Sequence, residues 1–261
     1  MPELPEVEIY KRYLDATALR QRIARVDVRN AYVLKGVSAR ELARRLNGRL
    51  LDSSRRHGKH LFVRTDGEFW LRLHFGMTGS VHYFKDTAAV SRHARVVFVF
   101  VNNHGLAFND QRQFGEIGLV RNVDDFLKTH ALGPDALKID LQKFRNILGN
   151  RRGAVKAVLL NQRIIAGIGN LYADEILFRA RIHPATELSR MGDKVFTKLF
   201  QAAKYVLRKA IAAKADAKPV PNSWLLSHRE KGTKCPRCGR VLRSMTIGGR
   251  TAWFCPHCQR G

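Results

Sequence analysis

The sequence predicts an α+β protein with two domains, the first an antiparallel β-sandwich or barrel and the second helical. Three observations support this prediction. Short runs rich in Val, Ile and Phe, separated by Gly, Asn and Asp, fill the first half. Helical spacing replaces them after about residue 124. Two Cys-x-x-Cys pairs close the chain, so the second domain is expected to end in a metal-binding module.

In the first half, one helix is expected to precede the strands. Val7, Tyr10 and Leu14 recur at helical spacing from Val7 to about Arg20. Ser38 and Glu41 have the spacing of a capping box, which predicts a short helix ending near Leu46. The apolar runs expected to form strands are 23–28, 50–51, 60–63, 69–73, 96–101 and 117–120.

The second half shows four segments with helical periodicity, and Gly133-Pro134 marks the expected hinge before them. The expected helices are 139–148, 154–162, 171–181 and 193–214. We therefore expect a β-sandwich domain over 1–124, a linker over 125–138, a helical domain over 139–229 and a metal module over 230–261.

The charge is strongly unbalanced. The chain has 261 residues with 47 Lys and Arg against 22 Asp and Glu, a net charge of +25. Such a charge favours a polyanionic partner, most often nucleic acid, over the alternatives of a generally basic protein or a membrane-surface binder. No apolar run of 18 residues and no secretory signal is visible in the sequence. We expect a cytoplasmic protein, nucleoid-associated in a bacterium, with no membrane partner.

The cysteines predict one structural zinc ion. Sixteen residues separate the pairs, which are Cys235 with Cys238 and Cys255 with Cys258. Four thiolates satisfy tetrahedral zinc and leave no position open for catalysis, whereas a redox pair is the alternative. The segment between the pairs should form a hairpin that turns at 247–250. Arg250 at the tip could contact a phosphate or a DNA groove, or it could be an exposed arginine that only increases solubility; the spacing favours neither.

The first residues can carry amine chemistry. If Met1 is removed, Pro2 becomes a terminal secondary amine, and about a tenth of an α-amino group is neutral at pH 7. Attack on a sugar aldehyde would give an iminium, an electron sink that assists elimination. Glu3 could protonate a leaving or ring oxygen, and Glu6 follows one helical turn later. The alternative is an ordinary helix start with proline and acidic residues in its first turn.

Several loops pair glycine with side chains that could contact DNA. Met77 and Phe114 lie beside glycines in loops that follow apolar runs. A protein that extrudes a base could insert such side chains into the vacated base stack. The alternative is that both side chains pack in the core. Gly167 and Gly169 allow close backbone approach before the helix near 171, whose N-terminus can bind an anion and which Asn170 could cap. Residues 55–59 form a basic cluster, either a phosphate contact or a solvated run.

These motifs, in this order, resemble the formamidopyrimidine-DNA glycosylase and endonuclease VIII family over nearly the whole chain. The resemblance implies a β-sandwich, a helix-two-turn-helix domain and a zinc finger. It implies that Pro2 is the nucleophile and Glu3 the general acid. The set Met77, Arg112 and Phe114 is closer to the formamidopyrimidine branch, in which these side chains fill the space left by the extruded base.

The resemblance also implies roles for other residues. Those expected to hold phosphates around the extruded nucleotide are Lys59, His74, Asn170 and Arg250. Those expected near the lesion, the sugar or the recognition site are Glu6, Glu175 and Lys156, and His93 matches a DNA-contacting histidine. Two departures are visible. Gln113 replaces an arginine of the family motif, and the Gly- and Thr-rich loop that caps 8-oxoguanine is not recognisable between Lys214 and Lys231.

The resemblance thus implies a bifunctional DNA glycosylase and AP lyase of base-excision repair that excises oxidised bases with β,δ-elimination. Its partner would be double-stranded DNA with damaged bases or abasic sites. We expect a monomer with no organic cofactor. The alternatives are a non-catalytic zinc protein that recognises damaged or bent DNA, and an endonuclease VIII-like enzyme acting on oxidised pyrimidines, hydantoins or abasic sites.

Overall fold

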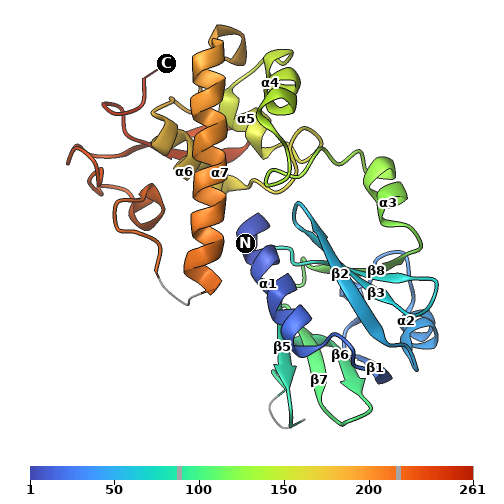
Figure 1. The fold of residues 1–261 in the computed structure, drawn as a ribbon. Coiled ribbons are helices and arrows are strands. Elements are labelled where there is room, and N and C mark those ends of the chain that lie inside the picture. The colour runs from blue at the N-terminus through green and yellow to red at the C-terminus, as the bar shows by residue number, and fades with distance from the viewer. Residues whose placement is uncertain (87–89, 216–218, 261) are drawn as a thin grey trace. The chain divides into compact units, whose positions relative to one another are not determined.

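The computed structural model describes residues 1–86, 90–215 and 219–260. It divides into two compact units, drawn with their elements in Figure 1. The first comprises Met1–Pro2 and Glu6–His130, and the second comprises Glu3–Pro5 and Ala131–Gly261. Three residues near the N-terminus therefore belong to the second unit.

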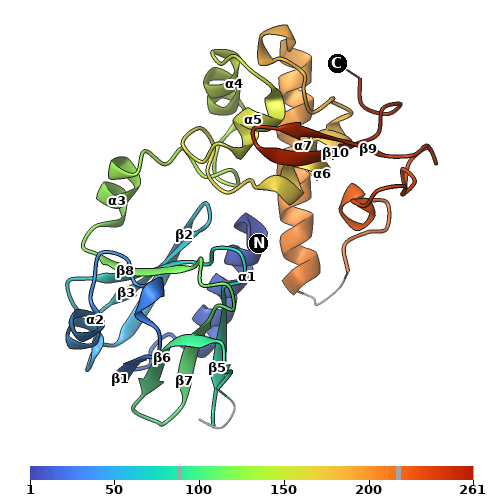
Figure 2. The same cartoon turned by 180° about the vertical axis from the view of Figure 1, so that it is seen from behind.

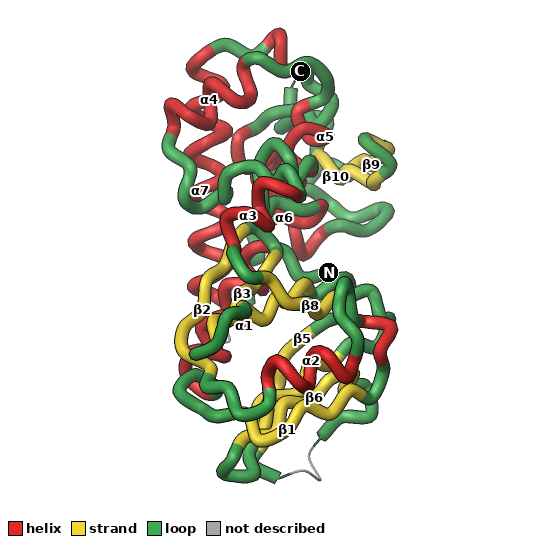
Figure 3. The backbone as a smooth tube through the Cα atoms, turned by 90° about the vertical axis from the view of Figure 1, so that its right-hand side faces the viewer, coloured by secondary structure: helices red, strands yellow, loops and turns green. Residues whose placement is uncertain are grey.

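The first unit is a β-sandwich of two four-stranded antiparallel sheets, as predicted (Figure 3). One sheet has the order β1-β6-β7-β5, formed by Ile23–Val28, Ala94–Phe100, Gly105–Asn109 and Ser80–Phe84. The other has the order β2-β3-β4-β8, formed by Leu51–His57, His60–Thr65, Trp70–His74 and Glu116–Val120.

The core of this unit lies between the two sheets. Its side chains include Phe98 and Phe100 of β6 and Leu71 and Leu73 of β4, which form one cluster with Leu14 of helix α1 (Leu4–Thr17). Burying one such side chain contributes roughly 1.5–3 kcal/mol. The intervening Val97 and Val99 of β6 point to the other face of the sheet, where they are buried in a second, smaller cluster.

The short helix expected between strands is confirmed. Helix α2 runs Ala39–Leu46, and the Ser38 hydroxyl accepts the N–H of Glu41 at 3.2 Å. This hydrogen bond satisfies one of the free N–H groups of the first turn. Leu42 and Leu46 are buried in the sandwich core, so the capped helix is fixed by its apolar face. A 3-10 turn, Ala31–Val33, precedes it.

Two strands and one helix were not expected. Strand β5 begins at Ser80, directly after Gly79, and strand β7 begins at Gly105, directly after a turn; neither segment was among the expected strands. Helix α3, Val123–Thr129, lies where the sequence suggested a linker. Only Val123 and Leu127 of this helix are buried, which leaves too short an apolar stripe to recognise.

The second unit is helical and ends in a two-stranded hairpin (Figure 2). Its elements are α4 (Leu141–Gly149), α5 (Val155–Leu160), α6 (Asn170–Ala180), α7 (Asp193–Ala215), β9 (Arg243–Ile247) and β10 (Arg250–Phe254). The 3-10 turns Leu188–Arg190 and Leu225–His228 connect them. Helix α6 is central, because every residue from Tyr172 to Phe178 is buried. Within the described ranges, none of the helices combines the length and apolar character needed to cross a membrane.

Candidate functional site

The four cysteines form a zinc site, as predicted. Their sulfur atoms all lie within 4.8 Å of one another, and Cys238 Sγ is 3.5 Å from Cys255 Sγ. Tetrahedral Zn–S bonds of about 2.3 Å place sulfurs about 3.8 Å apart, whereas a disulfide requires about 2.05 Å. The N–H of Arg237 points to Cys235 Sγ at 3.4 Å, and that of Cys258 to Cys255 Sγ at 3.4 Å. The set fits one structural zinc with no open ligand position.

The zinc-site hairpin presents Arg250 at its tip. Ile247 pairs directly with Arg250, so the turn has two residues, Gly248 and Gly249. Both have positive φ, at 56° and 70°, which a tight hairpin turn requires and glycine permits. Arg250 is exposed. The predicted turn is confirmed, and the Arg250 side chain is available to a ligand.

A buried carboxylate, Asp174 of α6, locks the hairpin to the helices. Its Oδ1 lies 2.6 Å from Lys156 Nζ, and its Oδ2 lies 2.9 Å from Arg229 Nη2. The backbone N–H of Trp253 in β10 also donates to Oδ2 at 3.2 Å. Lys156 donates a further bond to the carbonyl of Thr251 at 2.8 Å. One acidic side chain therefore joins α5, α6, β10 and the segment after residue 228.

Lys156 was expected at the recognition site, and the structure places it under the hairpin. Its side chain is completely buried, and its ammonium group is occupied by Asp174 and Thr251. Asp174 itself was missed. Its signal in the sequence was the pair Asp174-Glu175 in an otherwise apolar helix, since a buried acid without a cationic partner is very unfavourable.

The carboxylate of Glu3 caps the N-terminus of α6. Its Oε2 accepts the N–H of Gly169 at 2.7 Å, and its Oε1 accepts that of Leu171 at 2.8 Å. Tyr172 donates to Oε2 at 3.3 Å. These are N–H groups that a helix cannot satisfy internally, and the positive end of the helix dipole favours the carboxylate charge. Glu3 is 1% exposed, so it is an internal anchor of the second unit.

The glycines of the 164–172 turn make this contact possible. A Cβ on Gly169 would lie 2.3 Å from Glu3 Cδ, and one on Gly167 would lie 2.4 Å from Leu4 Cδ1. The expected close backbone approach is confirmed, and the anion at this helix start is the carboxylate of Glu3 and not a ligand. The suggested cap by Asn170 is wrong: the cap position is Gly169, and Asn170 is the first helical residue.

Pro2 lies immediately before this anchored residue. It is partly buried and precedes α1, whereas Met1 is 49% exposed. Glu6 lies in the first turn of α1, where a negative charge complements the helix dipole. The pKa of Tyr10 is raised, first by burial and then by the charge of Glu6.

The three residues expected to fill the space of an extruded base are gathered on two adjoining loops of the first unit. Met77 is 39% and Phe114 54% exposed, so the core-packing alternative is wrong for both. The guanidinium of Arg112 lies 5.1 Å from the centre of the Phe114 ring. A cation over an aromatic face is favourable, and the pair forms an exposed wedge.

Asp110, which is fully buried, shapes this wedge. Its Oδ1 accepts the Thr78 hydroxyl, and its Oδ2 accepts the N–H of Gly115 at 2.6 Å. Thr78 Oγ1 in turn accepts the N–H of Arg112 at 3.0 Å. The loops also touch closely, because a Cβ on Gly76 would lie 2.3 Å from the Phe114 backbone.

Gln113, which stands where the family motif has an arginine, makes a hydrogen bond within the first unit. Gln113 adopts positive φ of 58°, and its Oε1 accepts Asn30 Nδ2 at 3.1 Å. His93 lies close to the same loop, because its carbonyl accepts the N–H of Asp110 at 3.0 Å. Gln113 therefore fastens the wedge loop to the turn at residue 30 without adding a cation.

His74 lies at the end of β4 as a neutral ring. Burial lowers its pKa to about 4, assisted by the charges of Arg72 and Lys59, although Glu116 opposes the shift. Its Nδ1 accepts the N–H of Gly76 at 3.3 Å. The proton of the neutral ring is therefore on Nε2, which is a hydrogen-bond donor.

Lys59 occupies the two-residue turn between β2 and β3. Arg56 supports this turn, because it donates to the Gly58 carbonyl at 3.0 Å and forms an ion pair with Glu8 at 2.8 Å. Arg55 pairs with Asp124 at 2.6 Å. Arg55 and Arg56 of the basic cluster therefore have partners within the first unit. The alternative of a solvated charged run is wrong for these two residues.

Glu175 of α6 is buried and holds the 3-10 turn at Leu225–His228. Its Oε2 accepts the N–H of Leu226 at 3.0 Å. Burial raises its pKa to about 7, although the N–H groups of Leu225 and Leu226 and the charges of Arg179 and Arg237 oppose the shift. The carboxyl group therefore positions the segment that follows residue 219.

The sandwich, the helical unit with its anion-capped helix, and the four-cysteine hairpin define a modular protein with a zinc finger. The sequence matches the "Formamidopyrimidine-DNA glycosylase N-terminal domain" over 1–117 and the "Formamidopyrimidine-DNA glycosylase H2TH domain" over 132–220. It matches the "Zinc finger found in FPG and IleRS" over 232–261. The chain belongs to the formamidopyrimidine-DNA glycosylase family, and α5 to α6 lie in its H2TH domain.

Relatives match over all or nearly all of their length. The chain is 36% identical to the formamidopyrimidine-DNA glycosylase of Solibacter usitatus, with both chains covered completely. It is 36% identical to that of Moorella thermoacetica, with 93% of each chain covered. The solved Lactococcus lactis Fpg in complex with abasic-site DNA is 28% identical, with complete coverage of both chains and a TM-score of 0.89. A solved MutM with carbocyclic 8-oxo-G DNA gives the same identity, coverage and score.

Proposed function

We propose that this chain is a bifunctional DNA glycosylase and AP lyase that acts on damaged or abasic double-stranded DNA. The single observation that carries the proposal is the anchoring of Glu3 by three backbone N–H groups directly beside Pro2. The full-length relatives, one of them solved with abasic-site DNA, support this substrate class.

In this mechanism the nitrogen of Pro2, freed by removal of the exposed Met1, bonds to C1′ of the extruded nucleotide. The glycosidic bond breaks and the base leaves. The Glu3 carboxylate takes the N–H proton released by the attacking amine and passes it to the ring oxygen, and cleavage of the bond between C1′ and that oxygen gives an iminium. Loss of a C2′ proton then expels the 3′ phosphate, and a second elimination expels the 5′ phosphate. The iminium is the electron sink, so the chemistry requires no organic cofactor, and zinc serves only the hairpin.

The other expected site residues take supporting roles in this proposal. Lys59 and neutral His74 donate to phosphates from the first unit, and Asn170 and Arg250 do so from the second. Met77, Arg112 and Phe114 enter the base stack. Glu6 and His93 contact the nucleotide region. Because they are buried, Lys156 and Glu175 act by holding the Arg250 hairpin and the 225–228 turn.

Borohydride reduction during reaction with an abasic duplex tests the proposal, because it converts the iminium to a stable cross-link. Processed wild-type protein should be trapped, and Pro2→Gly should not. Glu3→Gln retains one acceptor for the α6 N–H groups but cannot transfer a proton, so excision of a damaged base should fall by about 10²–10⁴-fold. Absence of trapping by the wild type would leave a zinc protein that binds damaged DNA without catalysis.

The damaged base that this chain excises is a question separate from the strand-cleavage chemistry. The segment between Lys214 and Lys231 differs from the loop pattern associated with 8-oxoguanine, and residues 216–218 lie outside the described part of the chain. A panel of single-lesion duplexes with 8-oxoguanine, formamidopyrimidines, hydantoins and oxidised pyrimidines would rank the substrates directly.

A further inference from the structure

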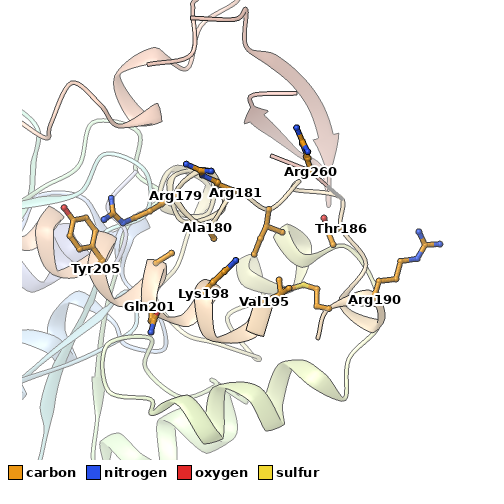
Figure 4. A pocket seen from close by; sticks show the side chains of 13 residues that line it. Arg179, Ala180, Arg181, Thr186, Arg190, Val195, Lys198, Gln201, Tyr205 and Arg260 are labelled. Atoms are coloured by element: carbon orange, nitrogen blue, oxygen red, sulfur yellow. The ribbon is translucent and has the colours of Figure 1, made fainter. Parts of the chain in front are cut away.

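A basic hollow of about 840 Å³ lies in the second unit between the end of α6 and the side of α7. Its lining includes five exposed cations and, within the described part of the chain, no acidic side chain. These cations are Arg179, Arg181, Arg190, Lys198 and Arg260. None of them forms an ion pair with a described acidic residue. Figure 4 shows the arrangement, in which Arg190 points away from the others.

One cation is held in place by an aromatic ring. The guanidinium of Arg179 lies 3.4 Å from the centre of the Tyr205 ring, and the two side chains face each other in Figure 4. Stacking orders the guanidinium yet leaves its in-plane N–H groups available to an anion. Because its guanidinium is already ordered, Arg179 loses less conformational entropy on binding an anion than an unrestrained lysine side chain does.

The hollow continues along an exposed stripe of α7. Lys194, Lys198, Gln201, Tyr205 and Arg208 recur at spacings of three or four residues and lie on one face of the helix. Gln201 and Tyr205 also line a second hollow of about 810 Å³ that contains Arg208 and Lys209. From Lys194 to Arg208 the stripe is about 21 Å long, which matches about six base pairs of one DNA strand.

This surface lies at the opposite ends of the elements that carry the proposed DNA-binding groups. Helix α6 begins at Asn170 and ends beside Arg181, about 15 Å away along its axis. The hairpin presents Arg250 at its tip, whereas Arg260, beyond its base, pairs with Ile182 just after α6. The hollow is therefore distinct from the N-terminus of α6 and from the hairpin tip.

A structural role accounts for only part of the charge. Cations near the C-terminus of α6 interact favourably with the helix dipole, which explains Arg179 and Arg181 but not Lys198 or Arg260. A surface that serves only solubility normally carries interspersed acidic and basic side chains. Helix α7 instead carries six Lys or Arg residues and one acid, Asp193. An extended polyanion fits this pattern better than a single small phosphate does.

We propose that this surface binds the phosphate backbone of a second DNA duplex while the first occupies the active site, which allows direct transfer between DNA segments. The choice of duplex DNA as the polyanion rests on the proposed function. The geometry of the surface itself involves none of the residues assigned to catalysis.

Competitor-stimulated dissociation tests this proposal. Wild-type protein is loaded on a fluorescent duplex containing a tetrahydrofuran abasic analogue and challenged with unlabelled undamaged duplex. The dissociation rate should rise with competitor concentration. In the variant Arg181→Glu/Lys198→Glu it should become independent of competitor, while the Kd for the labelled duplex stays within about threefold of the wild type.

The matched control is Arg25→Glu/Arg40→Glu, which makes the same charge change at exposed positions of the first unit. It should transfer like the wild type. The proposal is overturned if the Arg181/Lys198 variant keeps the wild-type competitor dependence, if the control loses it equally, or if single-stranded RNA or pyrophosphate accelerates release and duplex DNA does not. Borohydride trapping, measured on the same variant, should be unchanged, and its failure in the wild type would instead contradict the proposed chemistry.

Discussion

The carboxylate of Glu3 accepts a hydrogen bond from the backbone N–H of Gly169 at 2.7 Å, across 166 residues of sequence. The contact fixes the residue that follows Pro2 on the start of α6. A nucleophile gains rate from fixed geometry, because the entropy of positioning is lost before the reaction begins. The residue next to the proposed nucleophile is thus held within the second unit, to which Glu3–Pro5 belong by their contacts.

Gly169→Ala tests this anchoring. The added Cβ would lie 2.3 Å from Glu3 Cδ, so the carboxylate must move and lose its hydrogen bonds. We expect the rate of borohydride trapping on an abasic duplex to fall about 100-fold or more. The control is Gly149→Ala in α4, where no atom lies within 4 Å of the new Cβ. Equal trapping rates in the two variants would contradict the anchoring role.

Asp110→Asn tests the support of the wedge. An amide cannot accept from both the Thr78 hydroxyl and the Gly115 N–H, so a buried donor is left unsatisfied at a cost of about 1–3 kcal/mol. We expect the Kd for abasic duplex to rise about tenfold while zinc content and secondary structure are retained. The control Asp124→Asn removes an exposed acid that pairs with Arg55. Unchanged affinity in the Asp110 variant would show that the wedge does not depend on this hydrogen bonding.

Asp174→Asn tests the network beneath the zinc hairpin. It leaves the buried ammonium of Lys156 without its counterion, and such a loss costs about 3–5 kcal/mol of unfolding free energy. The double variant Lys156→Met/Asp174→Asn should recover at least half of this loss. Urea unfolding followed by tryptophan fluorescence provides the measurement, with exposed Asp193→Asn as control. Additive effects of the two substitutions would exclude a coupled pair.

Glu175→Gln tests the pH dependence of the second unit. The pKa of Glu175 is about 7 in the folded protein against 4.5 as the ordinary value, so the folded state binds this proton more tightly. Its contribution to stability is therefore complete below pH 4.5 and is lost as pH rises through 7. The loss is about 3 kcal/mol by linkage.

The glutamine variant has no such loss, yet its Oε1 can still accept the Leu226 N–H. Relative to the wild type it should gain about 3 kcal/mol of unfolding free energy between pH 4 and pH 8. The difference between the two proteins isolates this group from the histidines, which titrate in both. A difference that stays constant over this range would show that Glu175 ionises normally.

Local patterns in the sequence predicted the fold well. The Ser38 cap, the Gly248-Gly249 turn and the helix over 193–214 each depend on residues close in sequence, so spacing alone identified them. Strands β5 and β7 were missed because they are short and adjoin glycine-rich turns. Their apolar faces are explained only by the opposite sheet of the sandwich.

The site residues also divide into those predicted from local motifs and those that depend on residues distant in sequence. The cysteine spacing alone predicted the zinc site, whereas the motifs around Met77 and Phe114 left core packing open until the structure showed both side chains to be exposed. The capping of α6 by Glu3 and the burial of Lys156 depend on partners 166 and 18 positions away. No periodicity encodes such pairings, so they required the structure.

The most direct test of the account is to locate the covalent bond. Processed wild-type protein is reduced with borohydride on an abasic duplex, digested, and mapped by mass spectrometry. The account predicts that the deoxyribose-derived mass lies on the peptide that begins with Pro2, on the proline nitrogen. A cross-link on Lys59 or another lysine, or no cross-link with fully processed protein, would contradict it.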